Sequence, residues 1–376
     1  MSTVAYTVFW ICGLLLVHIF AGYPLWIWLQ ARLFPRPVRK RPITPKVTVV
    51  IAAYDSAAYI QAKLANLACL GYPREKLDII VACDGCHDDT ARLAREFGDP
   101  RVQVLEFPTR RGKAACLNNA VAQARGDVLL LTDVRQKLSP QALRDLMANL
   151  ADPAVGAVGG ELMLSDPDTG FAQSVDAYWR YEKLIRHAES RSGSTIGVSG
   201  ALYAIRRELF EPLPEGTVLD DVLVPMRVIA AGHRVVFEPS ALAWDRATQA
   251  PMEERRRKIR TLAGNCQLIQ LAPWLLLPWR NPAWFRFVSH KLLRLLGPWL
   301  LLGLALTSAC LASSYLLCAV TLALLALGAA MVVIGRLQPA AVRWLPLRLA
   351  MAFFYLNLFA AQAVVTFARN RGLHLW

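Results

Sequence analysis

Two long stretches of this sequence carry no formal charge, and they limit what the chain can fold into. Residues 4–29 and residues 295–335 contain no Asp, Glu, Lys or Arg. A helix that spans a bilayer needs about 20 mainly apolar residues, so the first stretch predicts one span and the second predicts two. Residues 349–368 supply a fourth candidate. The first stretch is too long for a cleaved signal peptide and has no basic residue before it, so we interpret it as an anchor.

The net charge of +14 could indicate nucleic-acid binding, but the positions of the basic residues argue against that. Lys and Arg cluster at 32–46, directly after the first span, and at 280–294, directly before the second. Arg336 and Arg348 lie between the third and the fourth. Basic residues at span ends set orientation and contact anionic lipid. The clusters fall on one side of a four-span chain, which predicts an integral, multi-pass inner (cytoplasmic) membrane protein with its central domain in the cytoplasm and both termini outside.

Between the first and second spans, short apolar runs alternate with helical stretches. The runs are "VTVVIAAY", "LDIIVAC", "RVQVLEF", "DVLLLTD" and "VGAVGGELML", and helices are predicted over 57–70 and 141–150. This alternation predicts an α/β domain with a mostly parallel sheet covered by helices. Ligands bind such sheets beyond the carboxyl ends of the strands, where Tyr54, Asp84 and Asp133 are placed. No glycine-rich loop of the dinucleotide or P-loop type follows a strand.

Two segments carry polar residues that suit ligand binding. In "ACDGCHDDT", Asp84 ends a strand and can accept a hydrogen bond, whereas Asp88 and Asp89 are good helix caps. In "RRGKAACLNNA", Lys113 stands at a helix start, where cations suit a diphosphate. A solvated basic turn is the alternative interpretation of the second segment.

Three further segments carry residues that suit catalysis. "LDDVLVPMR" opens a helix with Asp220 and Asp221; one of them can be a general base, and helix capping is the plain alternative. "ERRRKIRTLAGN" places cations three residues apart on one helical face, as a clamp on a leaving phosphate requires; contact with lipid headgroups is the alternative. "LLLTDVRQ" delivers Asp133 to a strand end, and Arg135 stands where paired-carboxylate chemistry would want a second acid.

Taken in their order along the chain, these segments resemble the membrane-bound family 2 glycosyltransferases. This is the inverting GT-A group that includes cellulose, chitin and hyaluronan synthases and ceramide glucosyltransferases. The resemblance covers about residues 47–264. It implies a GT-A (Rossmann-like) sheet domain inserted between transmembrane helices, one before it and about three after it. The implied divisions are an N-terminal transmembrane helix at 1–30, a basic Pro-rich linker at 31–46, the GT-A domain at 47–250, interfacial helices with an RxxR motif at 251–291, and C-terminal transmembrane helices at 292–376.

The resemblance also implies a role for each matching residue. The implied donor-binding residues are Ala53, Tyr54, Asp84, Lys113, Asp133 and Arg135, with Asp84 on the nucleotide base. The implied acceptor pocket lies around Ser199 and Gly200. The implied catalytic group is Asp220, Asp221, Arg257 and Arg260, with Asp221 as the general base. A divalent cation, Mg²⁺ or Mn²⁺, is implied at Asp133.

The sequence departs from the family pattern at three places, and the first of them, Asp220 in place of Glu in the ED motif, is a small change. Arg135 replaces the second acid of the DxD motif, and a guanidinium, which is a permanent cation matched to phosphate, could take over part of the metal's role. In the QxxRW motif, Arg257 replaces Gln and Thr261 replaces Trp. Thr261 offers no large stacking face to a sugar ring, so we expect one sugar to be added per encounter.

The resemblance implies inverting transfer of a sugar from a nucleotide-diphosphate donor, expected to be a UDP-sugar, to a lipid-linked or saccharide acceptor in surface-polysaccharide or glycolipid synthesis. The expected partners are the donor, the acceptor and membrane lipids, without nucleic acid; no oligomeric state is predicted. Two alternatives remain open: a processive polysaccharide synthase, and an inactive nucleotide-binding scaffold of an export complex. A transporter is disfavoured because the spans contain no charges, which substrate paths usually need.

Overall fold

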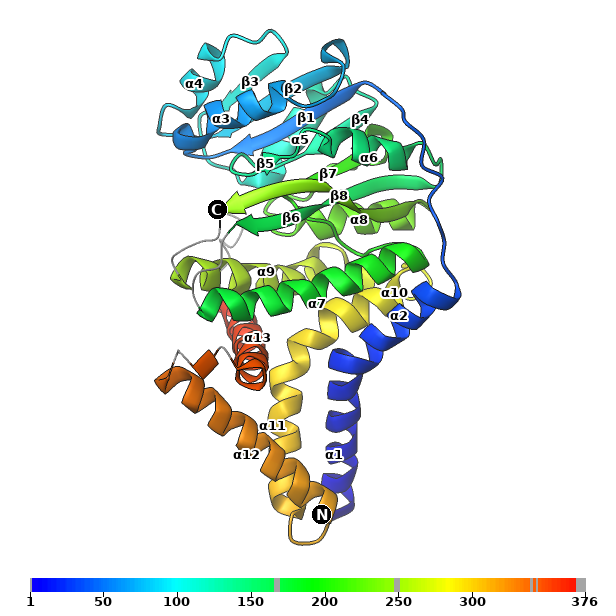
Figure 1. Ribbon diagram of the computed structural model, residues 1–376, viewed down its shortest axis with the longest axis vertical. Helices are drawn as coiled ribbons and strands as arrows, with labels where there is room; N and C mark the ends of the chain where they lie inside the picture. The colour runs from blue at the N-terminus through cyan, green and yellow to red at the C-terminus, as the bar shows by residue number, and fades with distance from the viewer. Residues whose placement is uncertain (1, 166–169, 247–250, 339–340, 343, 370–376) are drawn as a thin grey trace.

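The computed structural model describes residues 2–165, 170–246, 251–338, 341–342 and 344–369 (Figure 1). An eight-stranded sheet with helices on both faces stands above a group of long helices. The strands are β1 (Val47–Ala53), β2 (Leu77–Asp84), β3 (Val102–Phe107), β4 (Val128–Leu131), β5 (Lys137–Leu138), β6 (Val155–Ser165), β7 (Tyr203–Arg206) and β8 (Arg234–Arg246).

The sheet has the order β3-β2-β1-β4-β7-β6-β8-β5 and is mostly parallel, as predicted. Strands β3, β2, β1 and β4 run parallel to one another, and β7 pairs antiparallel with both β4 and β6. Strands β5, β7 and β8 have no counterpart among the predicted apolar runs. In β8, Pro239 lies where the register against β6 shifts between Gly160 and Glu161, because proline cannot donate to the ladder.

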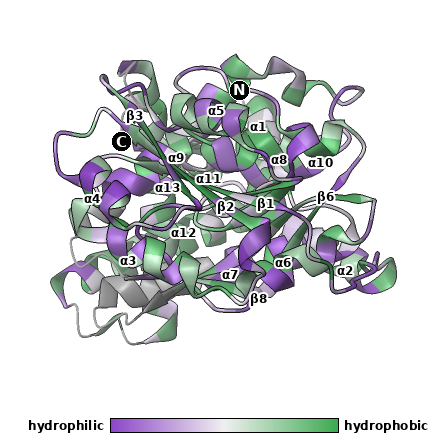
Figure 2. Ribbon diagram, turned by 90° about the horizontal axis from the view of Figure 1, so that it is seen from above, coloured by the Kyte–Doolittle hydropathy of each residue, from purple (hydrophilic) through white to green (hydrophobic). Residues whose placement is uncertain are grey.

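Alternate residues of β1 enter two different cores, so the central strands are buried on both faces. Val49 and Ile51 pack toward α3 (Ala57–Ala68), α4 (Thr90–Glu96) and α6 (Ala142–Leu150). Val50 and Ala52 pack toward α5 (Lys113–Gln123) and α8 (Asp220–Ala230). Figure 2 shows β1 and β2 as hydrophobic ribbon through the centre of the domain. Burial on both faces is what makes these strands continuous apolar runs in the sequence.

Four helices are long and apolar enough to cross a membrane, one before the domain and three after it, as predicted. They occupy Thr3–Leu33, Trp284–Leu311, Leu316–Leu337 and Leu345–Arg369. The component helices are α1 (Ser2–Val17), η1 (His18–Gly22), α2 (Tyr23–Leu33), α10 (Trp284–Phe287), η5 (Val288–Leu292), α11 (Leu293–Leu311), α12 (Leu316–Leu337) and α13 (Leu345–Arg369). The first helix thus extends past residue 30 and the second begins before 292, while residues 250 and 376 lie outside the described ranges.

The far end of the helical group contains both the start of α1 and the turn between α11 and α12. The rings of Tyr6 and Tyr315 stack there with centroids 4.7 Å apart. Helix α13 packs against α7 (Gly170–Ser192) and α9 (Pro251–Leu271) directly beneath the sheet domain. Arg255 Nε, for example, donates to Gln362 Oε1 at 3.3 Å.

Two short π-helical turns lie side by side where the long helices meet the domain. One is η1 and the other is η5. His18 Nε2 and Ser289 Oγ, one from each turn, are 3.0 Å apart. Each turn contains one more residue than an α-helical turn and so changes the direction of the side chains around it.

A buried charged network joins α7 to the long helices. Glu189 accepts hydrogen bonds from Tyr23 Oη at 2.5 Å and from His290 Nδ1 at 2.8 Å. Glu182 contacts His290 Nε2 at 3.0 Å and forms an ion pair with Arg294. Each ring nitrogen of His290 therefore contacts a carboxylate, Nδ1 that of Glu189 and Nε2 that of Glu182.

The network changes the interpretation of the basic cluster at 280–294. The sequence analysis assigned this cluster to anionic lipid. In the structure, Arg286 instead donates to the carbonyl oxygens of Glu189 and Ser194 at 2.8 and 2.6 Å. Arg294 is buried against Glu182, and Lys291 lines an internal pocket. Arg286 and Arg294 therefore bind the protein itself, and Lys291 faces an internal pocket.

We expect His290→Ala to destabilise the protein, because it leaves Glu182 and Glu189 buried with fewer partners. Removal of one member of a buried ionic network costs about 3 kcal/mol or more. The measurement is the midpoint of thermal unfolding in detergent micelles, and the matched control is His187→Ala, an exposed histidine on α7. An unchanged midpoint for His290→Ala would show that the network does not hold α7 in place.

Candidate functional site

The carboxyl ends of the central strands and the starts of two helices meet at one cavity of about 340 Å³. Strand β4 lies between parallel β1 and antiparallel β7, at the point where the direction of the sheet changes. Lys113 begins α5, and Asp220 and Asp221 begin α8. Helix starts next to a switch point of an α/β sheet form a common position for ligand sites.

Asp133 lies in the turn after β4, and a buried lysine, Lys63, forms hydrogen bonds with residues on either side of it. Lys63 Nζ donates to Thr132 Oγ1 and to the carbonyl oxygen of Gln136, both at 2.8 Å. Burial lowers the pKa of Lys63 to about 7, against the opposing effect of Asp133. The turn that presents Asp133 is therefore fixed on both sides of that residue.

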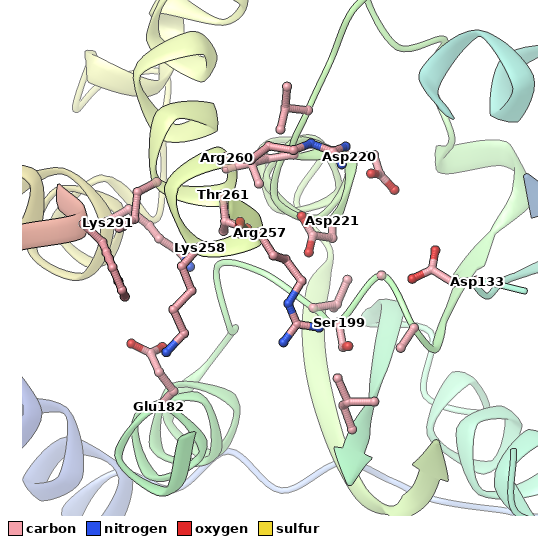
Figure 3. Close-up of a pocket in the computed structure, with 18 of the residues that line it drawn as sticks. Asp133, Glu182, Ser199, Asp220, Asp221, Arg257, Lys258, Arg260, Thr261 and Lys291 are labelled. Carbon is pink, nitrogen blue, oxygen red and sulfur yellow. Dashed lines mark hydrogen bonds between the residues drawn. The ribbon is translucent and has the colours of Figure 1, made fainter. Parts of the chain in front are cut away.

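Four predicted residues converge around Gly200. Lys113 Nζ lies 3.0 Å from Asp133 Oδ1 and 3.4 Å from Asp220 Oδ2. A Cβ atom on Gly200 would lie 3.2 Å from Lys113 Nζ, 3.9 Å from Asp221 Cβ and 4.0 Å from Asp133 Oδ2. Glycine leaves this space open between the charged groups. Ser199 lines the same cavity beside it (Figure 3).

The electrostatics of this cluster prepare Asp221 to accept a proton. Burial and the adjacent Asp220 raise the pKa of Asp221 to about 6, and Lys113 limits the rise. For Lys113, burial disfavours the charged form, but Asp133, Asp220 and Asp221 outweigh it and raise the pKa of the ammonium group. Lys113 therefore remains cationic while Asp221 exchanges protons near neutral pH.

Helix α9 brings Arg257 and Arg260 to the cavity, as the three-residue spacing predicts. The helix can approach because Gly264 has no side chain: a Cβ atom there would lie 2.7 Å from Leu219 Cγ, next to Asp220. Thr261 also lines the cavity, and its hydroxyl donates to the carbonyl oxygen of Arg257 at 3.0 Å. No aromatic ring is supplied from this position of the motif.

Asp84 ends β2, as predicted. It is fully buried, and its two carboxylate oxygens accept hydrogen bonds from the backbone N–H groups of Arg111 and Gly112, both at 2.8 Å. In this arrangement Asp84 fixes the loop before α5. Ala53 is buried at the end of β1, and the next residue, Tyr54, has the Arg110 guanidinium 3.8 Å above its ring.

Arg135 does not line the cavity. Its guanidinium donates to Asp245 Oδ2 at 2.7 Å, and Gln136 Nε2 donates to the same oxygen at 2.9 Å. Asp245 lies in β8 and is buried. The geometry therefore ties Arg135 to the sheet and does not support its predicted contact with a diphosphate.

Several residues that line the cavity are not among the predicted site residues. Arg186 comes from α7, Lys291 from η5 and Lys258 from α9, while Tyr355 and Phe359 come from α13. Lys291 belongs to a cluster assigned to lipid, and Arg186 lies in a helix that was not predicted. Lys258 lies within the quoted segment "ERRRKIRTLAGN", whereas no short motif surrounds the other residues, which meet through tertiary packing alone.

The arrangement can hold an anionic group at Lys113 and accept a proton at Asp221. Asp133 offers an oxygen, Oδ2, that faces Gly200 and has no hydrogen-bond partner among the residues that the structure describes. A carboxylate oxygen of this kind suits Mg²⁺ or Mn²⁺ that is shared with phosphate oxygens. The chemical requirements for transfer of a group from a diphosphate are thus present in one cavity.

Comparison with known proteins agrees with this geometry. The model of the glycosyltransferase like family 2 matches residues 45–264, which contain every predicted site residue. The chain is 25% identical over 232 residues to the probable glycosyltransferase YdaM of Bacillus subtilis and 25% identical over 205 residues to a poly-beta-1,6-N-acetyl-D-glucosamine synthase of Staphylococcus aureus. These matches cover 59% and 53% of this chain, but only 55% and 49% of the two relatives, so the chain spans about half the length of the curated relatives it matches.

One solved structure resembles the chain over nearly its whole length. It is a mannosyltransferase from Pyrobaculum calidifontis in complex with GDP-Man and Mn²⁺. The TM-score is 0.72 at 26% identity, over 97% of this chain and 99% of that one. The similarity therefore includes the long helices as well as the sheet domain.

Proposed function

This chain belongs to the family 2 glycosyltransferases, and from that premise we propose that it transfers a sugar from a nucleoside diphosphate donor to a membrane-associated acceptor, with inversion at the anomeric carbon. The observation that carries this proposal is the convergence of Lys113, Asp133, Asp220 and Asp221 around Gly200. Lys113 and Asp133, at one end of that cluster, suit a diphosphate, and Asp221, at the other end, supplies a general base for the acceptor hydroxyl.

In the proposed reaction, an acceptor hydroxyl attacks the anomeric carbon while Asp221 takes its proton. The bond from that carbon to the diphosphate oxygen breaks, and the nucleoside diphosphate leaves with the electron pair. The leaving group needs positive charge rather than an acid, because a nucleoside diphosphate is a weak base. Lys113 and Arg260 supply permanent charge, and Arg257 extends it along α9.

We propose that Asp133 binds a divalent cation together with the donor diphosphate. The mannosyltransferase of similar structure was solved with Mn²⁺, and the free Oδ2 of Asp133 fits one protein ligand to such an ion. When bound, the cation neutralises charge on the leaving diphosphate. Arg135 adds no ligand oxygen, so the ion would depend on Asp133 and the donor for its non-water ligands.

The acceptor side favours addition of one sugar at a time onto a lipid-linked or saccharide acceptor. Thr261 provides no stacking platform for a growing chain, and α13 closes the cavity with apolar residues. The nucleotide base is a finer question: the family resemblance favours uridine, while the mannosyltransferase of similar structure was solved with a guanosine donor.

The test of this function is a transfer assay with the full chain in proteoliposomes and a panel of labelled UDP- and GDP-sugars. With excess donor and a trace of membrane-extracted acceptor, we expect an organic-soluble product that is one residue longer. A ladder of long chains would favour the processive polysaccharide synthase. Nucleotide binding without turnover by any donor would favour the inactive scaffold.

Asp221→Asn should lower kcat by about two to four decades, because it removes a general base at nearly constant volume. Binding of the nucleoside diphosphate should be retained. In the wild-type enzyme, kcat/KM should fall as the pH drops through about 6, where protonation removes the base. A variant that keeps more than a tenth of the wild-type rate would remove Asp221 from this role.

We also propose that the sheet domain faces the cytoplasm across the inner membrane, since the basic clusters lie at its end of the long helices. Ser313 lies in the turn at the far end, and Arg125 is exposed on the sheet domain. With the exposed Cys69 and Cys310 replaced by Ser, Ser313→Cys should react with an impermeant thiol reagent in intact cells, and Arg125→Cys should react only after permeabilisation. Reaction of the second variant in intact cells would reverse the orientation.

A further inference from the structure

The catalytic cavity contains a second group of cations that the proposed donor site does not use. Arg186 from α7 and Lys291 from η5 line it together with Lys258 from α9. Figure 3 shows Asp221 between Asp133 on one side and Lys291 on the other. Lys291 therefore lies on the side of the general base that is opposite to Asp133.

Neither Arg186 nor Lys291 has a hydrogen bond or an ion pair within the part of the chain that the structure describes. Glu182 also lines the cavity, but its two carboxylate oxygens already contact His290 and Arg294. In total, six Lys and Arg side chains but only four carboxylates line the cavity. Partly buried cations without partners are costly, so this side of the cavity is built to receive an anion.

The wall next to these cations is apolar and comes from α13. It consists of Ala352, Tyr355, Leu356 and Phe359. Leu162 and Leu262 extend the apolar surface from the sheet and from α9. An anion-binding pair beside an apolar wall, at the junction of the sheet domain with the long helices, fits a ligand that has an anionic head and a hydrocarbon tail.

We propose that the acceptor is a saccharide joined to its lipid through a phosphate or diphosphate, and that Arg186 and Lys291 bind this phosphate. The inference rests on the proposed function, because it assigns the acceptor class of the same cavity. The lipid follows the α13 wall, and the sugar hydroxyl lies beside Asp221. In the transfer step, the hydroxyl oxygen forms the new bond to the anomeric carbon, its proton passes to Asp221, and the nucleoside diphosphate leaves from Lys113.

The proposal explains why one cavity contains two groups of cations. A donor diphosphate at Lys113 and Asp133 leaves Lys291 without a phosphate partner, since Asp221 lies between Asp133 and Lys291 (Figure 3). Two anionic ligands can then be present together, each with its own counter-charges. An uncharged acceptor would leave the second pair of cations desolvated without compensation.

The test is binding of tritiated dodecyl phosphate to the full chain in phosphatidylcholine nanodiscs, with dodecyl maltoside as the uncharged probe. Arg186→Gln and Lys291→Gln should each weaken dodecyl phosphate binding by about tenfold or more, whereas Arg186→Lys and Lys291→Arg should largely retain it. The matched control is Arg191→Gln, an exposed arginine on the same helix, and it should bind as the wild type does. Binding of the nucleoside diphosphate in each variant reports whether the donor side is folded.

Equal binding of the two probes, or equal binding by the wild type and the Gln variants, would overturn the inference. Complete competition by equimolar inorganic phosphate, or displacement of dodecyl phosphate by saturating nucleoside diphosphate, would also overturn it. Equal competition by phosphatidylglycerol would likewise assign the cations to bulk lipid rather than to an acceptor. Because binding requires no turnover, absence of sugar transfer would contradict the proposed function without affecting this result. Conversely, if an uncharged alkyl glycoside served as acceptor with the same KM as a phosphate-linked acceptor, the proposed sugar transfer would stand and the phosphate site would be excluded.

Discussion

The buried contacts of Glu182 and Glu189 with His290 are the interaction on which the position of the catalytic cavity depends. They join α7, which lies under the sheet, to the helices that begin the membrane-directed part of the chain. Arg186 lies four residues after Glu182 and three before Glu189, so all three share one face of α7. The face that fixes the helix also presents a cation to the cavity. Since a buried charge without its partner is strongly unfavourable, the helix has little freedom to rotate.

The cavity is divided between two structural layers with different requirements. The sheet domain supplies Lys113, Asp133 and Asp221, and these are held by strand ends and helix starts. The helices beneath the sheet supply the arginines of α9 and the apolar wall of α13. Gly264 permits the two layers to touch next to Asp220. The groups proposed for proton transfer and for the metal therefore come from strand ends and helix starts, which fix their geometry, while the apolar part of the cavity comes from the long helices.

The parts of the fold that could be predicted from sequence are those with a local pattern. Strand β1 and the long helices were predictable because continuous apolar runs reflect burial in a sheet or in a bilayer. Helix α7 was not, because its inward face carries Glu182 and Glu189, which an apolar period does not reveal. The positions of Lys113 and Asp221 follow from motifs at helix starts. The partner of Arg135 could not be predicted, since Asp245 lies 110 positions away and joins it only through the pairing of β5 with β8.

The π-helical turn at Val288–Leu292 connects helix geometry directly to the electrostatics of the cavity. Each residue of an α-helix advances by about 100° around the axis, so one inserted residue redirects its neighbours by more than a quarter of a turn. In this turn, His290 reaches the two glutamates and Lys291 reaches the cavity, although basic residues at this depth ordinarily point to lipid headgroups. A deletion of a single residue here would leave the hydrophobic length of the helix almost unchanged. It would nevertheless turn His290 and Lys291 by about 100° around the helix axis, away from the two glutamates and the cavity, so the phase of this helix decides which of its side chains are internal.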